Sequence, residues 1–189
     1  MPKGIEYNSR VVLTFALISL IATMLGNATE HLTTTAVFCV YRSSPKDPLF
    51  YLRLFGHVFG HNDWGHFSSN MLMLLLTGPL LEEKYGSRMM LYLILFTALA
   101  TGLIHIAFFP ETVLLGSSGV VFAFILLASF TGDGQGKIPL TFIIIAIIYL
   151  GREVLTAVTV EDQISHLAHV IGGTVGCVFG YRFKSSRTV

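Results

Sequence analysis

Three short polar patterns stand at the edges of apolar segments of the chain. They are His66-x-x-x-Asn70, Gly116-Ser117-Ser118-Gly119, and His169 followed by glycines at positions 172, 176 and 180. A serine hydroxyl becomes a strong nucleophile when a neighbouring base takes its proton, and histidine is well suited to be that base. Attack on a carbonyl then produces an oxyanion, which needs hydrogen-bond donors aimed at it. The residue types therefore predict acyl transfer by a serine and a histidine.

The donors are expected on a helix that begins near His66. His66 and Asn70 are four residues apart, so a helix stacks them on one face. The Asn70 amide, a ring N–H of His66 and the backbone N–H of Ser118 are the donors that we expect for the oxyanion. Helix packing or a turn also accounts for a Gly-Ser-Ser-Gly sequence taken alone. The prediction depends on all three patterns occurring in one chain.

The serine and the histidine are expected to meet where two small-residue helix faces dock. The glycines after His169 follow at intervals of three, four and four, which makes a smooth helix face that another backbone can approach closely. Gly119 and Ala123 form a matching small edge, and docking of the two brings Ser118 within hydrogen-bond reach of His169. No acidic residue stands near His169 in its segment, so a dyad is expected rather than a triad. Spacing alone leaves Ser117 as a second candidate nucleophile.

The elements that position these residues are expected to be membrane-spanning helices. Of the 189 residues, 53% are hydrophobic and 12% are charged, against about 25% charged in soluble domains. The expected fold is all-α, a polytopic bundle of six transmembrane helices, in one domain that covers residues 1–189. The six expected spans are roughly Val11–Leu25, Trp64–Leu81, Met89–Phe109, Ser118–Thr131, Ile138–Leu150 and Ile164–Tyr181.

The distribution of charge predicts the orientation and excludes one class of partner. With six spans, the side that holds both termini carries eight Lys and Arg residues and the other side carries four, so both termini are expected in the cytoplasm. We expect a multi-pass protein of a prokaryotic cytoplasmic membrane. The net charge of +1 and the lack of a basic cluster give no sign of nucleic-acid binding. Cys39 and Cys177 form no disulfide framework and match no metal spacing.

Two other interpretations of the polar residues remain open. His57 and His61 have the spacing of zinc ligands, but Val58 stands where a zinc protease carries glutamate, and we favour hydrogen bonds that brace the long outer connection. No metal and no organic cofactor is predicted. A non-enzymatic membrane transporter or substrate-binding chaperone is the rival function, with the polar face lining a path. Transporters often contain inverted repeats, and the sequence shows no internal repeat.

The three motifs resemble those of the rhomboid family, the intramembrane serine proteases. The family pattern has His and, four residues later, Asn in the second helix, Gly-x-Ser-Gly at the start of the fourth, and His before small residues in the sixth. The match runs from about Arg53 to Gly180 and keeps the order of all three motifs. The resemblance implies a protease that hydrolyses a peptide bond in or near the transmembrane segment of a membrane-protein substrate, which enters laterally from the lipid bilayer.

The resemblance also implies a role for each site residue. Ser118 is the implied nucleophile and His169 the implied general base, and His66, Asn70 and the Ser118 amide form the implied oxyanion hole. Gly116 and Gly119 support the serine, and Phe122 stacks on the catalytic histidine where many family members have Tyr. The sequence departs from the family at 52–53, where Leu-Arg stands in place of a frequent Trp-Arg. From its position alone, and not from the resemblance, the connection 151–163 is a candidate for a mobile lid over the cavity, and the sequence leaves open whether it acts as a gate.

Overall fold

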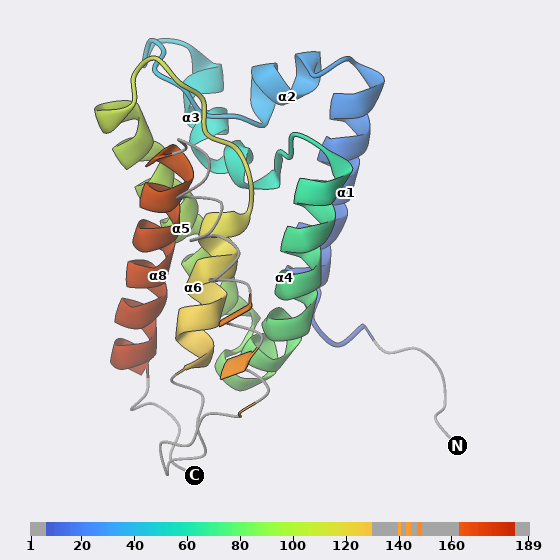
Figure 1. The fold of residues 1–189 in the computed structure, drawn as a ribbon, viewed down its shortest axis with the longest axis vertical. Coiled ribbons are helices and arrows are strands. Elements are labelled where there is room, and N and C mark those ends of the chain that lie inside the picture. Colours follow the sequence, from blue (N-terminus) through green and yellow to red (C-terminus); the bar gives the residue numbers. More distant parts are fainter. Residues whose placement is uncertain (1–6, 130–139, 141–142, 145–146, 149–162, 184–189) are drawn as a thin grey trace.

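The computed structural model describes residues 7–129, 140, 143–144, 147–148 and 163–183. Within these residues, five long helices run side by side, and shorter helices cross one end of the bundle (Figure 1). The long helices are α1 (Arg10–Ala28), α4 (Trp64–Tyr85), α5 (Ser87–Phe108), α6 (Ser118–Ala128) and α8 (Gln163–Phe183). The shorter ones are α2 (Leu32–Val37), α3 (Pro48–Gly56) and the single 3-10 turn His57–Phe59.

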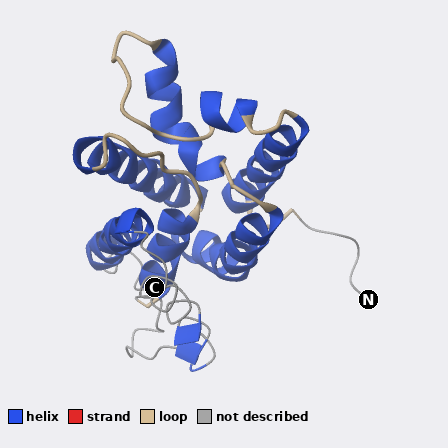
Figure 2. Cartoon of the chain, turned by 45° about the horizontal axis from the view of Figure 1, so that its top comes forward, coloured by secondary structure: helices blue, strands red, loops and turns tan. Residues whose placement is uncertain are grey.

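The described part of the chain contains no β-strand, as the all-α prediction requires (Figure 2). The expected starts at Trp64 and Ser118 are confirmed, whereas α4 continues past Leu81 to Tyr85. The expected span Ile138–Leu150 lies largely outside the described residues, and so does most of the expected lid.

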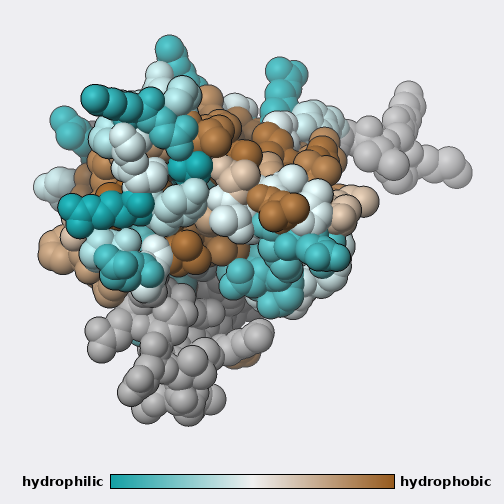
Figure 3. Space-filling model, turned by 90° about the horizontal axis from the view of Figure 1, so that it is seen from above, coloured by the Kyte–Doolittle hydropathy of each residue, from teal (hydrophilic) through white to brown (hydrophobic). Residues whose placement is uncertain are grey.

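Two of the described helices, α1 and α5, are long and apolar enough to cross a membrane, and α6 is a shorter apolar helix. The count of six spans stays a prediction. The outward faces of the long helices carry exposed apolar side chains, which suit contact with lipid. Examples are Leu17, Ile21 and Met24 on α1, Leu72 and Leu80 on α4, and Phe96 and Leu103 on α5. The end of the molecule that carries α2 and α3 shows a mixture of hydrophilic and hydrophobic side chains (Figure 3).

Helix α6 lies in the middle of the bundle and packs against α4, α5 and α8 (Figure 1). Nearly every residue from Gly119 to Ala128 is buried, in keeping with the rule that a helix apolar on all sides belongs in a core. The N-terminal end of α6 is therefore held by protein on several sides. Any chemistry at Ser118 takes place on a rigid support.

The helix ends are fixed by carboxylates. Asp63 is the N-cap of α4, where its side chain accepts a hydrogen bond of 2.8 Å from the His66 backbone N–H. At the other end of α4, the Glu82 carboxylate accepts bonds of 2.9 and 3.0 Å from the first N–H groups of α1, at Val11 and Val12. A negative group at the start of a helix also interacts favourably with the helix dipole. These contacts define where α4 begins and hold its C-terminal part against the start of α1.

The long connection between α1 and α4 is tied down by Arg53. Its guanidinium donates to the Ala36 carbonyl at 3.1 Å and to Ser43 Oγ at 3.2 Å, and it forms an ion pair with Asp47 at 3.1 Å. Its side chain also lies over the ring of Tyr41, with 4.6 Å to the centroid. The arginine anchors this connection although leucine stands before it in the sequence.

Candidate active site

Helices α6 and α8 pack through their glycines and run in the same direction. A Cβ added at Gly172 would collide with the backbone carbonyl of Gly119, and one added at Gly176 would collide with that of Ala123. One turn of α8 thus matches one turn of α6 along the contact. The docking predicted from the two small-residue edges is present, and the absence of side chains is what allows it.

This docking places His169 on the face of α6 that starts with Ser118. The imidazole of His169 is stacked on the ring of Phe122, with 4.2 Å between centroids and 12° between planes. Ser118 and Phe122 are four residues apart in α6, so their side chains share one face. Ala168, next to His169, faces Gly119, where an added Cβ would lie 3.4 Å from the Ala168 carbonyl oxygen. The structure therefore brings the predicted nucleophile and base to the same turn of the helix pair.

The two serines of the Gly-Ser-Ser-Gly motif have different surroundings. Ser117 has no exposed surface, and its hydroxyl lies 3.1 Å from Nε2 of His61. Ser118 is only partly buried. A nucleophile has to be reached by its substrate, and of the two only Ser118 meets that requirement. Spacing alone leaves both serines open, whereas the family resemblance implies Ser118.

His66 lies against the backbone just before the serines. A Cβ added at Gly116 would lie 2.8 Å from Cε1 and 2.9 Å from Nε2 of His66. Gly116 also has φ of 121°, a backbone conformation that side chains disfavour. Asn70 follows one turn later on α4 and is buried. The His66 ring is thus held beside the turn that presents Ser118, and Asn70 occupies the next turn of the same helix.

His57 and His61 both hydrogen-bond to other segments of the protein. His57 contacts the Arg53 carbonyl through Nδ1 and Thr101 Oγ1 through Nε2, each at 3.2 Å. Burial lowers the pKa of His57 to about 4 and that of His61 to about 3, so both rings are neutral at physiological pH. Within the described ranges, no group of three or more His, Cys, Asp or Glu side chains is arranged to hold a metal ion.

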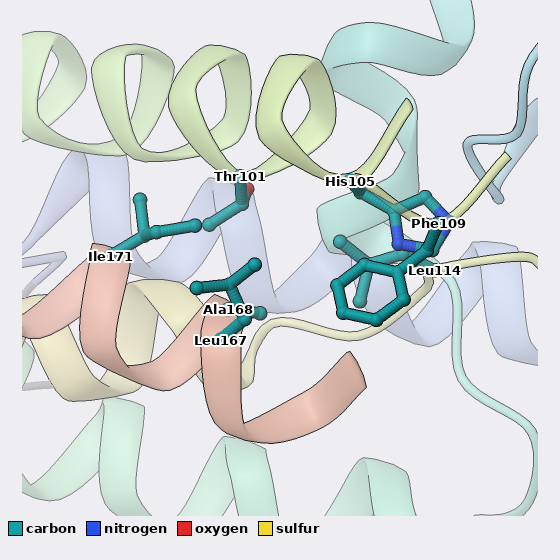
Figure 4. A pocket seen from close by; sticks show the side chains of 7 residues that line it. All are labelled: Thr101, His105, Phe109, Leu114, Leu167, Ala168 and Ile171. Carbon is teal, nitrogen blue, oxygen red and sulfur yellow. The ribbon is translucent and has the colours of Figure 1, made fainter. Parts of the chain in front are cut away.

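A recess beside the α8 turn that carries His169 is lined by α5, α8 and the segment before α6 (Figure 4). His105, for which no sequence motif predicts a role, lines this recess, and its Nε2 lies 3.1 Å from the Thr112 carbonyl oxygen. Thr101 contributes a second polar side chain, and the other lining residues are apolar. His105 thus ties the end of α5 to the loop that leads to the serines. In the sequence, the one indication of this contact is a histidine near the end of an apolar helix.

The comparisons with known proteins agree with the motifs. The family model described as the Rhomboid domain matches residues 49–186. Two curated proteins of Arabidopsis thaliana are similar to the chain, each 28% identical: Rhomboid-like protein 11, chloroplastic, and RHOMBOID-like protein 12, mitochondrial. The alignments cover 64% and 69% of this chain, and 48% and 46% of the two relatives. The chain therefore spans about half the length of these curated relatives.

Proposed function

The chain belongs to the rhomboid family, and from this premise we propose that it is an intramembrane serine endopeptidase with Ser118 as nucleophile and His169 as general base. The observation that carries the proposal is the stacking of the His169 imidazole on Phe122, one turn from Ser118 on the same face of α6. Stacked aromatic rings contribute about 0.5–1.5 kcal/mol, which helps to hold the base in one orientation. The docked glycines fix the distance between the two helices.

In the first half of the proposed reaction, Ser118 Oγ attacks the carbonyl carbon of the scissile peptide bond and its proton passes to His169. The carbonyl oxygen becomes an oxyanion, which we expect to be bound by the Asn70 amide, a His66 ring N–H and the backbone N–H of Ser118. The peptide C–N bond then breaks, and His169 returns the proton to the leaving amine. An acyl-enzyme on Ser118 remains.

In the second half, water attacks the acyl carbon while His169 takes a proton from it. The second oxyanion collapses, the ester bond to Ser118 breaks, and the proton returns to Ser118 Oγ. The serine is regenerated and a carboxylate product leaves. No redox partner takes part, because the whole reaction exchanges a peptide bond for an amine and an acid.

The proposed substrate is a membrane protein that reaches the site from within the bilayer. Family membership supports this substrate class, and the apolar outer faces of the long helices suit contact with lipid. The proposed orientation has both termini in the cytoplasm and rests on the distribution of Lys and Arg. The two plant relatives have organellar names, and the prokaryotic membrane stays a prediction.

Proteolysis of a transmembrane reporter in liposomes tests the proposal. The wild-type protein is expected to cut the reporter in or near its membrane segment, and Ser118→Ala and His169→Ala are each expected to remove this cleavage. Both variants should keep the wild-type melting temperature to within a few degrees. A folded wild-type protein that cleaves no member of a reporter panel, or a Ser118→Ala variant that still cleaves, would favour the rival transporter or chaperone.

A further inference from the structure

The backbone of His66 lies in the first turn of α4, at a point where that helix is open to solvent. Trp64 and Gly65 are exposed, whereas Phe67 packs against the hydrophobic core. A glycine also weakens a helix relative to alanine. The residues of α4 that can fray are therefore those from Trp64 to His66. Of these, His66 is the one with a proposed part in the reaction.

The Asp63 side chain holds this turn in place. Asp63 has extended backbone, with φ of −155° and ψ of 172°, which is the conformation from which a side chain caps a helix. Its Oδ1 accepts a hydrogen bond of 2.8 Å from the His66 N–H, and its carbonyl accepts one of 3.0 Å from the Phe67 N–H. The bond from the His66 N–H lowers the pKa of the Asp63 carboxyl, so the cap is ionised at neutral pH.

Two common supports of a helix start are absent from this one. A capping box needs Glu or Gln at the third helical position, where α4 has His66. A hydrophobic staple needs an apolar residue before the cap, where the chain has Asn62. The ring of Trp64 does meet that of Phe67, with 5.7 Å between centroids, but both belong to the same turn. The Asp63 carboxylate is therefore the main constraint on the backbone of His66.

The ring of His66 has a narrow place beside the serine motif. It meets the ring of His61 edge to face, with 5.0 Å between centroids and 75° between planes. Its second neighbour is Gly116, where an added Cβ would lie 2.9 Å from His66 Nε2. A ring between such close neighbours keeps its aim only while its own backbone stays in position. A displacement of about 1 Å in a catalytic group is enough to cost on the order of 100-fold in rate.

We propose that Asp63 is a positioning residue of the oxyanion hole, which fixes the first turn of α4 and thereby holds the ring of His66 beside the serine motif. This inference rests on the proposed protease function. Asp63 contacts no substrate atom and transfers no proton in this proposal. It acts only through His66, so its effect on the rate is expected to disappear when the His66 ring is absent.

The test is a double-mutant cycle between Asp63 and His66, followed by cleavage of a transmembrane reporter in liposomes. Asp63→Ala removes the cap, and kcat is expected to fall by about 2- to 30-fold, from the usual strength of an N-cap, with little change in KM. In a His66→Ala background no ring remains to be misplaced. The same Asp63→Ala change is then expected to alter kcat by less than about two-fold.

A merely structural role predicts a different cycle. Loss of folded protein would lower kcat by the same factor in both backgrounds, because it does not depend on the His66 ring. Equal factors would therefore overturn the inference. Absence of turnover in the wild-type protein counts instead against the protease function itself.

Two further variants decide the question if Asp63→Ala is poorly folded. Asp63→Asn keeps an oxygen that accepts from the His66 N–H, and its kcat is expected to stay within about three-fold of wild type. Gly65→Ala strengthens the same turn by its helix propensity. Outside the helix and the adjoining residues, the added Cβ would meet only Asp63 Oδ1, at 3.0 Å, and this atom is missing in an Asp63→Ala background.

The double variant with Gly65→Ala and Asp63→Ala is therefore expected to be faster than Asp63→Ala alone. An Asp63→Asn variant as slow as Asp63→Ala, or no gain from Gly65→Ala in that background, would also overturn the inference.

Discussion

The replacement Gly172→Ala tests whether the packing of α8 on α6 positions the catalytic base. A Cβ at this position would lie 2.7 Å from the carbonyl carbon of Gly119 and 3.0 Å from its Cα, with the carbonyl oxygen closer still. Ordinary contact for such atoms begins at about 3.4 Å, so the two backbones have to separate by about 1 Å. Because His169 lies one turn earlier on α8, its imidazole moves with the helix.

The expected loss of activity is large compared with the loss of stability. A displacement of about 1 Å in a catalytic group costs on the order of 100-fold in rate, and overpacking of a well-packed contact costs about 1–3 kcal/mol in unfolding free energy. Single-turnover cleavage of a transmembrane reporter in liposomes measures the loss of rate. Thermal unfolding followed by circular dichroism measures the loss of stability. Both should be recorded on the same preparation.

Gly173→Ala is the matched control. It adds the same methyl group to the neighbouring position of α8, where the Cβ would meet Leu126 side-chain atoms at 3.6 and 3.8 Å, which is ordinary contact distance. Turnover of this variant is expected to stay within about two-fold of wild type. Equal turnover in Gly172→Ala and Gly173→Ala would refute the argument that the glycine contact sets the position of His169.

Three further predictions concern the oxyanion hole, pH and metal. Asn70→Ala is expected to lower kcat by about 100- to 1,000-fold with little change in KM, and unchanged single-turnover cleavage in a destabilised protein would leave Asn70 with a structural role. Lowering the pH from 7 to 5 is expected to reduce the unfolding free energy by about 2 kcal/mol for each of His57 and His61. Their folded-state pKa values of about 4 and 3 lie below the pKa of histidine in the unfolded chain. The unfolded chain therefore binds more protons than the folded protein in this pH range, and acid favours unfolding. His61→Phe should remove one of these two contributions from the pH dependence of thermal unfolding, and an unchanged slope would contradict the neutral ring. EDTA or phenanthroline is expected to leave proteolysis at its full rate, and loss of activity with recovery on adding zinc would contradict the dyad mechanism.

Helix positions in this chain were predictable where the hydrophobic pattern and a local cap agree. Asp63 precedes the helix start at Trp64 and caps it, so the sequence and the structure share that boundary. The end of α4 was placed too early because apolar residues stop near Leu81, whereas the helix continues through charged residues to Tyr85. Hydropathy marks the part of a helix that sits in lipid, and backbone hydrogen bonds continue beyond it.

The short helices of the outer connection were less accessible to sequence reasoning. The sequence patterns identify this segment only as a long outer connection. Asp47 followed by Pro48 is an N-cap and first-turn signal, and α3 begins there with Asp47 accepting from the Leu49 N–H at 3.0 Å. The ties that hold this element are made by Arg53 to residues up to 17 positions away. Such contacts depend on the path of the loop, which no local pattern gives.

The sequence predicts which residues of the candidate site share a helix face, but not the contacts between residues of different segments. Helical spacing placed Ser118 with Phe122 and His66 with Asn70, because neighbours one turn apart share a face whatever the rest of the fold does. The contact between His61 and Ser117 joins residues 56 positions apart, and it distinguishes the two serines that spacing left open. Its detection required the three-dimensional arrangement of the outer connection over the start of α6.

The most direct test of the central claim is the attachment site of a covalent serine-hydrolase probe. The folded wild-type protein would be incubated with a fluorophosphonate in detergent, digested, and sequenced by tandem mass spectrometry. We predict a single adduct on Ser118, formed in proportion to activity and absent from His169→Ala, in which the hydroxyl has no base. An adduct on Ser117, or a folded protein that cleaves its reporter without any adduct on Ser118, would contradict the assignment of Ser118 as the nucleophile.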